Sequence, residues 1–260
     1  MIVRKQPDGQ LILIGQTDHS RLAGQLAAHW GNDAFAVPDP YDSMVRAAAF
    51  HDYGWLRYET SPLIHPETGE PYAFQTLPFD GGAQLESYQW SLDWMAGIDR
   101  YSGLIMNMHR TGLWRQRYGT ITYPTGYNPP QVGPEIQEFV ARNERWQEGE
   151  RTSWDLEKLW INYRLMQVWD LLALYFCCHE LCEDYIEPVP VNYSDENGVR
   201  LTMKPAGPAR AAFDPYPFSK RPCHVQLAWK RLPKTSFESL EAFRRDYFQA
   251  KHEIVQFELI

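Results

Sequence analysis

Residues 42–54, which read DSMVRAAAFHDYG, decide the fold that we predict for this chain. The segment has helical periodicity, with Asp42 as a suitable N-cap and Gly54 as a suitable residue just past the C-terminus. The three alanines at 47–49 leave a surface that another helix can approach closely, and His51 and Asp52 emerge from it. Two adjacent polar side chains placed in this way can bind one metal ion.

An earlier helical segment, residues 17–30, presents another histidine on its apolar side. His19 shares one helical stripe with Leu22 and Leu26. Asp18 or the residue before it can cap the helix. We therefore expect His19 at the buried end of an apolar face.

A third helical segment, roughly residues 153–184, carries Asp170 in the middle of its apolar stripe. An ionised carboxylate that faces a protein core is costly unless it is paired or coordinates a metal. Taken singly, His19, His51 or Asp170 is an ordinary hydrogen-bonded core residue. Three helices that each present such a residue toward an apolar face favour a shared metal site.

The order His19, His51-Asp52, Asp170 resembles the motif of the HD-domain superfamily of metal-dependent phosphohydrolases. The runs QTDH at 16–19, AAFHDYGW at 48–55 and MHRTGL at 108–113 more closely resemble an uncharacterised family of HD-like proteins. The resemblance implies a mainly α fold, in which an HD-like helical core holds one or two ions by His19, His51, Asp52 and Asp170. Such ligands suit Mn, Fe, Co, Ni or Zn without selecting among them.

Three further residues, together with Asp18, are candidates for the same site. His109 lies on a helical stripe with Ile105 and is interpreted as a general acid, a second-metal ligand or a core histidine. Asp18 is a second candidate for proton transfer. Arg110 is the candidate contact to an anionic substrate, and Trp55 the candidate pocket wall.

These features predict a metal-dependent hydrolase of a small phosphate ester or nucleotide, as the resemblance implies. Two alternatives stay open. The first is a di-iron oxygenase, which needs a second ion. The second is a non-catalytic metal-binding or ligand-sensing protein, because a fold that supports catalysis can also occur without it.

Length and periodicity predict the organisation of the chain. With 260 residues, 44% of them hydrophobic, we expect one domain over 1–260. A helical core would span 16–186, with loops at 59–83 and 118–134, the second a candidate lid. Residues 1–15 and 187–260 would form a small antiparallel sheet appended to it. Its strands are predicted from a hairpin over 2–6 and 11–15 and from alternating runs at 199–203, 225–229 and 255–259, with a helix over 236–251 between the last two.

The net charge and the hydropathy of the chain limit the kinds of binding partner that we expect. A net charge of -8 argues against general nucleic-acid binding and favours a small-molecule substrate. The sequence has no apolar stretch near the ~20 residues of a membrane span and no secretory apolar region at its start, which predicts a cytoplasmic protein without membrane contact.

The run CCHELC at 177–182 is a competing metal site. Cys178, His179 and Cys182 have spacings that a structural zinc site can use. Because the run continues a helix that is already used for packing, we expect buried free cysteines there instead.

Overall fold

The computed structural model of the protein describes residues 1–115, 133–194 and 198–260. The predicted lid at 118–134 therefore lies almost wholly outside the described residues. The helices are α1 (Gln16–His29), α2 (Tyr41–Phe50), the short 3-10 helix η1 (Tyr53–Trp55), α3 (Leu56–Thr60), α4 (Gly82–Ile98), α5 (Arg100–Trp114), α6 (Pro134–Arg151), α7 (Leu156–Cys178) and α8 (Leu240–Gln249). The strands are β1 (Ile2–Lys5), β2 (Leu11–Ile14), β3 (Asp184–Val189), β4 (Val199–Gly207), β5 (Arg210–Asp214), β6 (Cys223–Leu232) and β7 (His252–Leu259).

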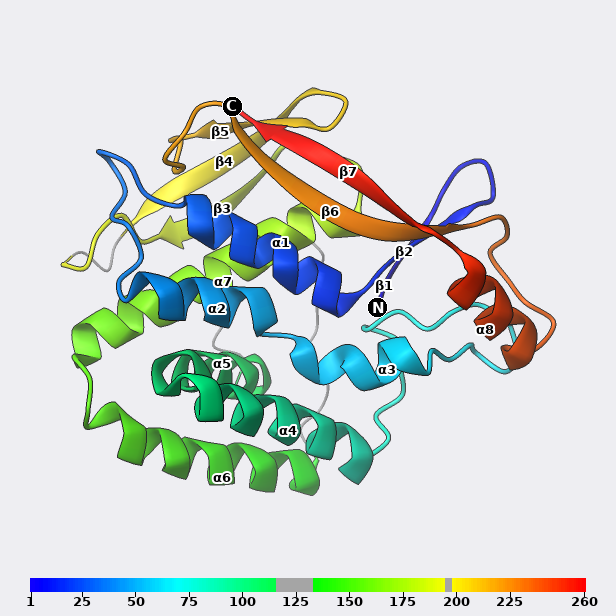
Figure 1. The fold of residues 1–260 in the computed structure, drawn as a ribbon, viewed down its shortest axis with the longest axis horizontal. Helices are drawn as coiled ribbons and strands as arrows, with labels where there is room; N and C mark the ends of the chain where they lie inside the picture. Colours follow the sequence, from blue (N-terminus) through cyan, green and yellow to red (C-terminus); the bar gives the residue numbers. More distant parts are fainter. Residues whose placement is uncertain (116–132, 195–197) are drawn as a thin grey trace.

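The strands form one seven-stranded sheet in the order β1-β2-β6-β7-β5-β4-β3. All neighbouring pairs are antiparallel except β5 and β7, which run parallel. The sheet curls into a half-barrel over α1 and α7, and α2, α4, α5 and α6 lie beyond them (Figure 1). With 48% helix and 21% strand the fold is α/β, so the predicted mainly α fold with a small antiparallel sheet is wrong.

Two strands account for most of this error. β3 contains Pro188 and two acidic residues, Asp184 and Glu187, and it begins within the predicted helical core. It lies at the edge of the sheet, where proline is tolerated. β5 reads RAAFD, and its alanines give little strand signal. The other five strands follow the predicted hairpin and alternating runs.

One hydrophobic core joins the sheet to the helices. Val225 and Leu227 of β6 and Leu201 of β4 belong to the same buried cluster as Leu22 of α1 and Leu171 of α7. The sheet therefore shares a buried cluster with the helices. That residues 1–260 form a single domain stays a prediction.

Helix α1 lies along the part of β6 that, among the described residues, has no strand on its β2 side. β2 pairs with β6 only over Lys230–Leu232, and farther along Gln25 takes the place of a strand. The Gln25 amide donates to the Gln226 carbonyl and accepts from the Gln226 N–H, both at 2.8 Å. A side chain thus satisfies the backbone of β6 and fixes α1 against the sheet.

Glycines allow the helices that carry the candidate ligands to approach closely. A Cβ atom on Gly24 of α1 would lie 2.5 Å from the Cβ and 2.8 Å from the Cα of Ala49 on α2. A Cβ atom on Gly112 of α5 would lie 1.8 Å from the hydroxyl of Tyr163 on α7. Gly24 therefore sets the distance between the helices of His19 and His51, and Gly112 that between the helices of His109 and Asp170.

We expect Gly24→Ala to lower the free energy of unfolding by about 1–3 kcal/mol, because the new methyl group meets the backbone of Ala49. Urea denaturation measures the change. Gly149→Ala in α6 is the control, since nothing lies within 4 Å of its added Cβ, and it should stabilise the protein by roughly 0.5–1 kcal/mol. Equal changes in the two variants would contradict the close approach of α1 and α2.

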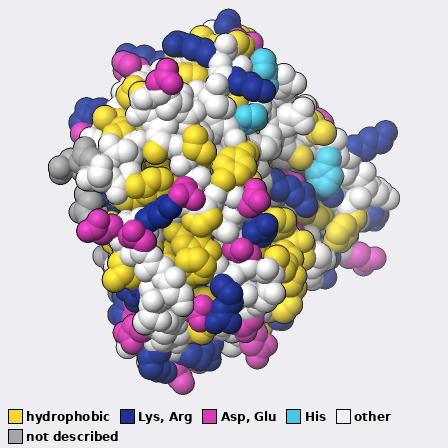
Figure 2. Space-filling view, turned by 60° about the vertical axis from the view of Figure 1, so that its left-hand side comes forward, with side chains coloured by type: hydrophobic (Ala, Val, Ile, Leu, Met, Phe, Trp, Pro, Cys, Tyr) yellow, Lys and Arg dark blue, Asp and Glu magenta, His cyan; other side chains and the backbone are white. Residues whose placement is uncertain are grey.

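The surface carries mixed charges on the face drawn in Figure 2, where Lys and Arg side chains are interspersed with Asp and Glu. The absence of general nucleic-acid binding stays a prediction. Within residues 1–115, 133–194 and 198–260, no helix is both long enough and apolar enough to span a membrane.

Candidate metal centre

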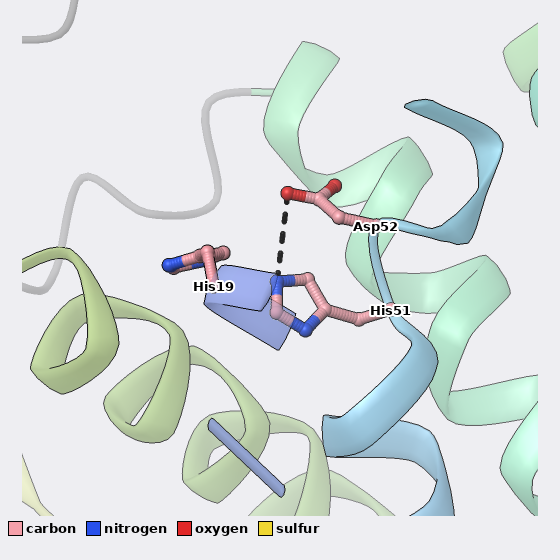
Figure 3. Close-up of side chains that lie close together, drawn as sticks. All are labelled: His19, His51 and Asp52. Atoms are coloured by element: carbon pink, nitrogen blue, oxygen red, sulfur yellow. Dashed lines mark ion pairs between the residues drawn. The ribbon is translucent and has the colours of Figure 1, made fainter. Parts of the chain in front are cut away.

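Four elements bring the candidate ligands to one place. His19 lies in the first turns of α1, His51 and Asp52 follow the last residue of α2, His109 lies in α5, and Asp170 in α7. All five side chains are buried. Figure 3 shows His51 and Asp52 at the end of α2, with His19 beside them. The structure therefore brings together residues that are up to 151 positions apart in sequence.

The distances are those of a tight cluster around Asp170. The His19 Nε2 atom lies 2.8 Å from Asp170 Oδ1, and the His51 Nε2 atom lies 3.3 Å from the same oxygen. The His51 Nε2 atom is also 3.6 Å from Asp52 Oδ2, the ion pair drawn in Figure 3. One imidazole nitrogen thus faces two carboxylates.

The tautomer of His51 makes this arrangement a suitable metal site. Its Nδ1 atom lies 2.8 Å from the carbonyl of Ala48, which can only accept, so Nδ1 carries a proton and donates. In the neutral imidazole, Nε2 then directs a lone pair at the oxygens of Asp52 and Asp170. Within the described part of the chain this buried nitrogen has no hydrogen-bond partner that meets the usual geometric criteria. A positive charge, either a proton or a metal ion, is needed between these atoms.

The pKa shifts of His51 and Asp170 also indicate that positive charge is favoured at this site. Burial lowers the pKa of His51, but the carboxylates of Asp52 and Asp170 outweigh it and the net shift is upward. Burial opposes ionisation of Asp170, yet its contacts with His19 and His51 hold the pKa of this carboxyl well below its usual range. Asp170 is therefore ionised, as a metal-binding carboxylate must be.

Arg110 and Gln16 orient Asp52. The Arg110 guanidinium pairs with Asp52 Oδ1 at 2.6 Å, and the Gln16 amide donates to Oδ2 at 3.2 Å. Arg110 also lies over the ring of Tyr88 at 4.2 Å. The residue predicted to contact substrate therefore also holds a candidate metal ligand in place, and mutation of such outer-shell partners typically weakens metal binding 10–100-fold.

His109 belongs to the same cluster. Its Nε2 atom lies 3.9 Å from Asp170 Oδ2, and its ring is 4.9 Å from that of His51. Burial, followed by the neighbouring His51, lowers the pKa of His109 to about 3. The imidazole is therefore neutral and able to coordinate an ion or accept a proton.

The donor atoms form two overlapping groups, each within 4.8 Å, that could hold a metal ion. One group comprises His19, His51 and Asp52, and the other comprises His51, His109 and Asp170. Imidazole and carboxylate donors of this kind suit divalent transition metals. Buried His and Asp residues that can hold an ion are thus confirmed, whereas the identity and number of ions stay predictions.

A cavity of about 50 Å³ adjoins the cluster. It is lined by Gln16, His19, Asp52, Trp55, Phe74, His109, Arg110, Leu113, Asp170 and Leu174. Because a water molecule needs roughly 10–15 Å³ of such space, the cavity can hold an ion with a few water molecules or a small substrate group. Trp55, the candidate pocket wall, forms part of the wall of this cavity.

Asp18 does not line this cavity. It is one residue from His19 and therefore rotated around α1, and it faces a separate cavity of about 280 Å³ that Lys230 and His252 also line. It pairs with Arg21 at 3.0 Å, and burial raises its pKa. Its predicted part in proton transfer is not supported by this position.

Sequence reasoning missed two residues that shape the site. Gln16 lies three residues before His19 on the same helix face, so the helical period could have identified it. Glu59 of α3 accepts from the backbone N–H of Thr17 at 3.1 Å and so caps α1, whose N-cap residue Gly15 has no side chain to do so. No local pattern links Glu59 to α1.

Fold and site together define an α/β protein with a buried His/Asp centre that can hold a metal ion. The chain belongs to the family described as protein of unknown function DUF3891, whose model matches residues 1–234. The expectation of an uncharacterised family is confirmed. The expected membership of the HD-domain superfamily is wrong, because the family model identifies only this uncharacterised family and the fold, with its curled seven-stranded sheet, is not the helical core that the resemblance implied. Searches of curated proteins and of solved structures found no match to the chain.

Proposed function

We propose that the protein is a metal-dependent hydrolase that acts on a small phosphate ester or nucleotide. The observation that carries the proposal is the convergence of three histidines and two aspartates in one buried cluster. All of them except His51 line one small cavity, with a guanidinium in its wall. Structural ion pairs do not need so many lone-pair donors around one point, whereas a metal centre does.

In this proposal His19, His51, Asp52 and Asp170 hold a divalent ion such as Mn, Fe, Co, Ni or Zn. When bound, such an ion supplies a Lewis acid that lowers the pKa of water and polarises a phosphoryl oxygen. The donor set fits this ion, because the His51 Nε2 lone pair and the carboxylates of Asp52 and Asp170 face one another.

The other cavity residues have separate tasks. Arg110 places a positive charge in the cavity wall, which attracts an anionic substrate and keeps Asp52 oriented. Trp55, Leu113 and Leu174 form an apolar wall that limits access of water. His109 is neutral and close to the cluster, so it is better placed than Asp18 to accept or return a proton.

A second candidate is a di-iron oxygenase. The group formed by His51, His109 and Asp170 favours it, because this group offers donors for a second ion beside the first. The two candidates differ in metal count and in the need for oxygen, so elemental analysis of protein purified with and without air separates them.

We expect His109→Gln to keep the metal content of the wild type while it lowers phosphatase turnover by about 10²-fold or more, because a group that transfers a proton contributes this much. Elemental analysis and a panel of phosphate esters measure the two quantities on the same preparation. His65→Gln, in a partly exposed turn away from the cavity, is the matched control and should change neither.

Each other outcome has a definite meaning. A drop from two ions to one in His109→Gln would make His109 a ligand and favour the oxygenase. Turnover and metal content that both stay unchanged would remove His109 from the site. Wild-type protein that binds an ion but hydrolyses none of the esters, with or without oxygen, would contradict the hydrolase and leave a metal-binding or ligand-sensing protein.

A further inference from the structure

A turn between α7 and β3 gathers three metal-binding side chains that the sequence pattern placed in a helix. The helical period predicts that α7 continues to about residue 184, but the helix ends at Cys178 and β3 begins at Asp184. The intervening turn brings His179, Cys182 and Asp184 together, with one donor atom from each within 4.8 Å of the others. A continued helix would point His179 and Asp184 in different directions.

The spacing of two of these donors matches a zinc site. The Cys182 Sγ atom lies 3.7 Å from the His179 Nδ1 atom. With Zn–S and Zn–N bonds of about 2.3 and 2.0–2.1 Å, a tetrahedral angle places sulfur and nitrogen about 3.6 Å apart. The distance between these two atoms is therefore that of one edge of a zinc tetrahedron.

Contacts around the turn hold this geometry. The ring of Tyr175 packs edge-on against that of His179 at 5.9 Å, and its hydroxyl donates to the Cys182 carbonyl at 2.8 Å. Glu180 is ion-paired with Arg4 of β1. His179 Nδ1 donates to the Glu180 carbonyl at 2.8 Å, so an ion that binds at Nδ1 displaces this proton, and the carbonyl must turn away or become a ligand.

Cys182 also differs from the other three cysteines. It is exposed, whereas Cys177 and Cys223 are buried and Cys178 is partly buried. An ion from solution can therefore reach its sulfur. Sulfur, nitrogen and oxygen donors in one turn select a borderline ion such as Zn²⁺ over Mg²⁺ or Ca²⁺.

We propose that His179, Cys182 and Asp184 form a second metal site, at the end of α7, that binds Zn²⁺ with water as a further ligand. The site is separate from the buried His/Asp centre, since Asp170 and the last residue of α7 are about 12 Å apart along the helix at 1.5 Å per residue. Its donors include a sulfur atom, which the buried centre lacks.

Cobalt substitution tests the site through its sulfur ligand. We expect Co²⁺ titration of the full chain to produce a saturable near-ultraviolet sulfur-to-cobalt band that disappears when excess Zn²⁺ is added. Cys182→Ser should abolish the band, and Asp184→Asn should weaken Zn²⁺ binding by about tenfold or more. Cys178→Ser, which removes the neighbouring thiol outside the cluster, and His51→Ala, which disrupts the buried centre, should both keep the band.

Three results would overturn the proposal: no band in the wild type, a band that survives in Cys182→Ser, or a band that excess Zn²⁺ fails to displace. Circular dichroism of each variant checks its fold, and the exposed position of Cys182 favours an unchanged one. Because the band reports only a sulfur ligand, failure of this site and failure of the proposed hydrolase are distinguishable.

Discussion

Asp170→Asn and His51→Ala are each expected to lose the bound metal of the buried centre while they keep the fold. Loss of an outer-shell partner typically weakens metal binding 10–100-fold, so loss of a ligand should weaken it by more than about 100-fold. Asn at 170 can still hydrogen-bond to His19, which lies 2.8 Å from the present carboxylate, and this contact favours retention of the fold. Elemental analysis after gel filtration measures the loss.

The control for this prediction is His224→Ala. His224 is exposed on β6 and lies 4.0 Å from the carboxylate of Glu258, so its removal should leave the metal content unchanged. Wild-type metal content in both Asp170→Asn and His51→Ala would rule out the buried centre as the metal site.

Arg110→Met is expected to cost about 3–5 kcal/mol in the free energy of unfolding, measured by urea denaturation with a chelator present. The guanidinium and its partner Asp52 have side-chain exposures of only 8% and 9%. Methionine fills much of the same volume but leaves the Asp52 carboxylate buried without its cation, and an uncompensated buried charge carries a penalty of this size.

Two comparisons isolate the charge. Arg21→Met removes a similar side chain, 63% exposed, from its ion pair with Asp18, and should cost less than about 1 kcal/mol. The double variant Arg110→Met with Asp52→Asn should recover part of the lost stability, because the amide carries no charge. If Arg110→Met and Arg21→Met cost the same, Asp52 does not depend on Arg110 in the way that the structure indicates.

The candidate site was more predictable than the fold around it. His19, His51 and Asp170 each interrupt the apolar face of a helix, and a polar group on such a face is visible in the helical period alone. The partners of these residues were not visible. Glu59 caps α1 across 42 positions of sequence, and Asp18 and His19 are neighbours whose side chains enter different cavities.

The fold was predictable where local signals were strong. The hairpin of β1 and β2 follows a Pro-Asp-Gly turn, and β4, β6 and β7 alternate clearly. β3 and β5 have weak strand signals, and the parallel pairing of β5 with β7 joins segments more than forty residues apart. These two strands form because they pair with distant segments of the chain. Helix α7 ends at Cys178 because the chain then enters β3.

The contact between Gln25 and Gln226 also protects the protein from association with itself. An open strand edge presents unpaired N–H and C=O groups that can pair with another chain and lead to aggregates. Gln25 occupies this edge of β6 through both of its amide atoms. The helix that carries His19 therefore also covers a strand edge that could pair with another chain. A substitution that displaces α1 would expose that edge and also disturb the metal centre.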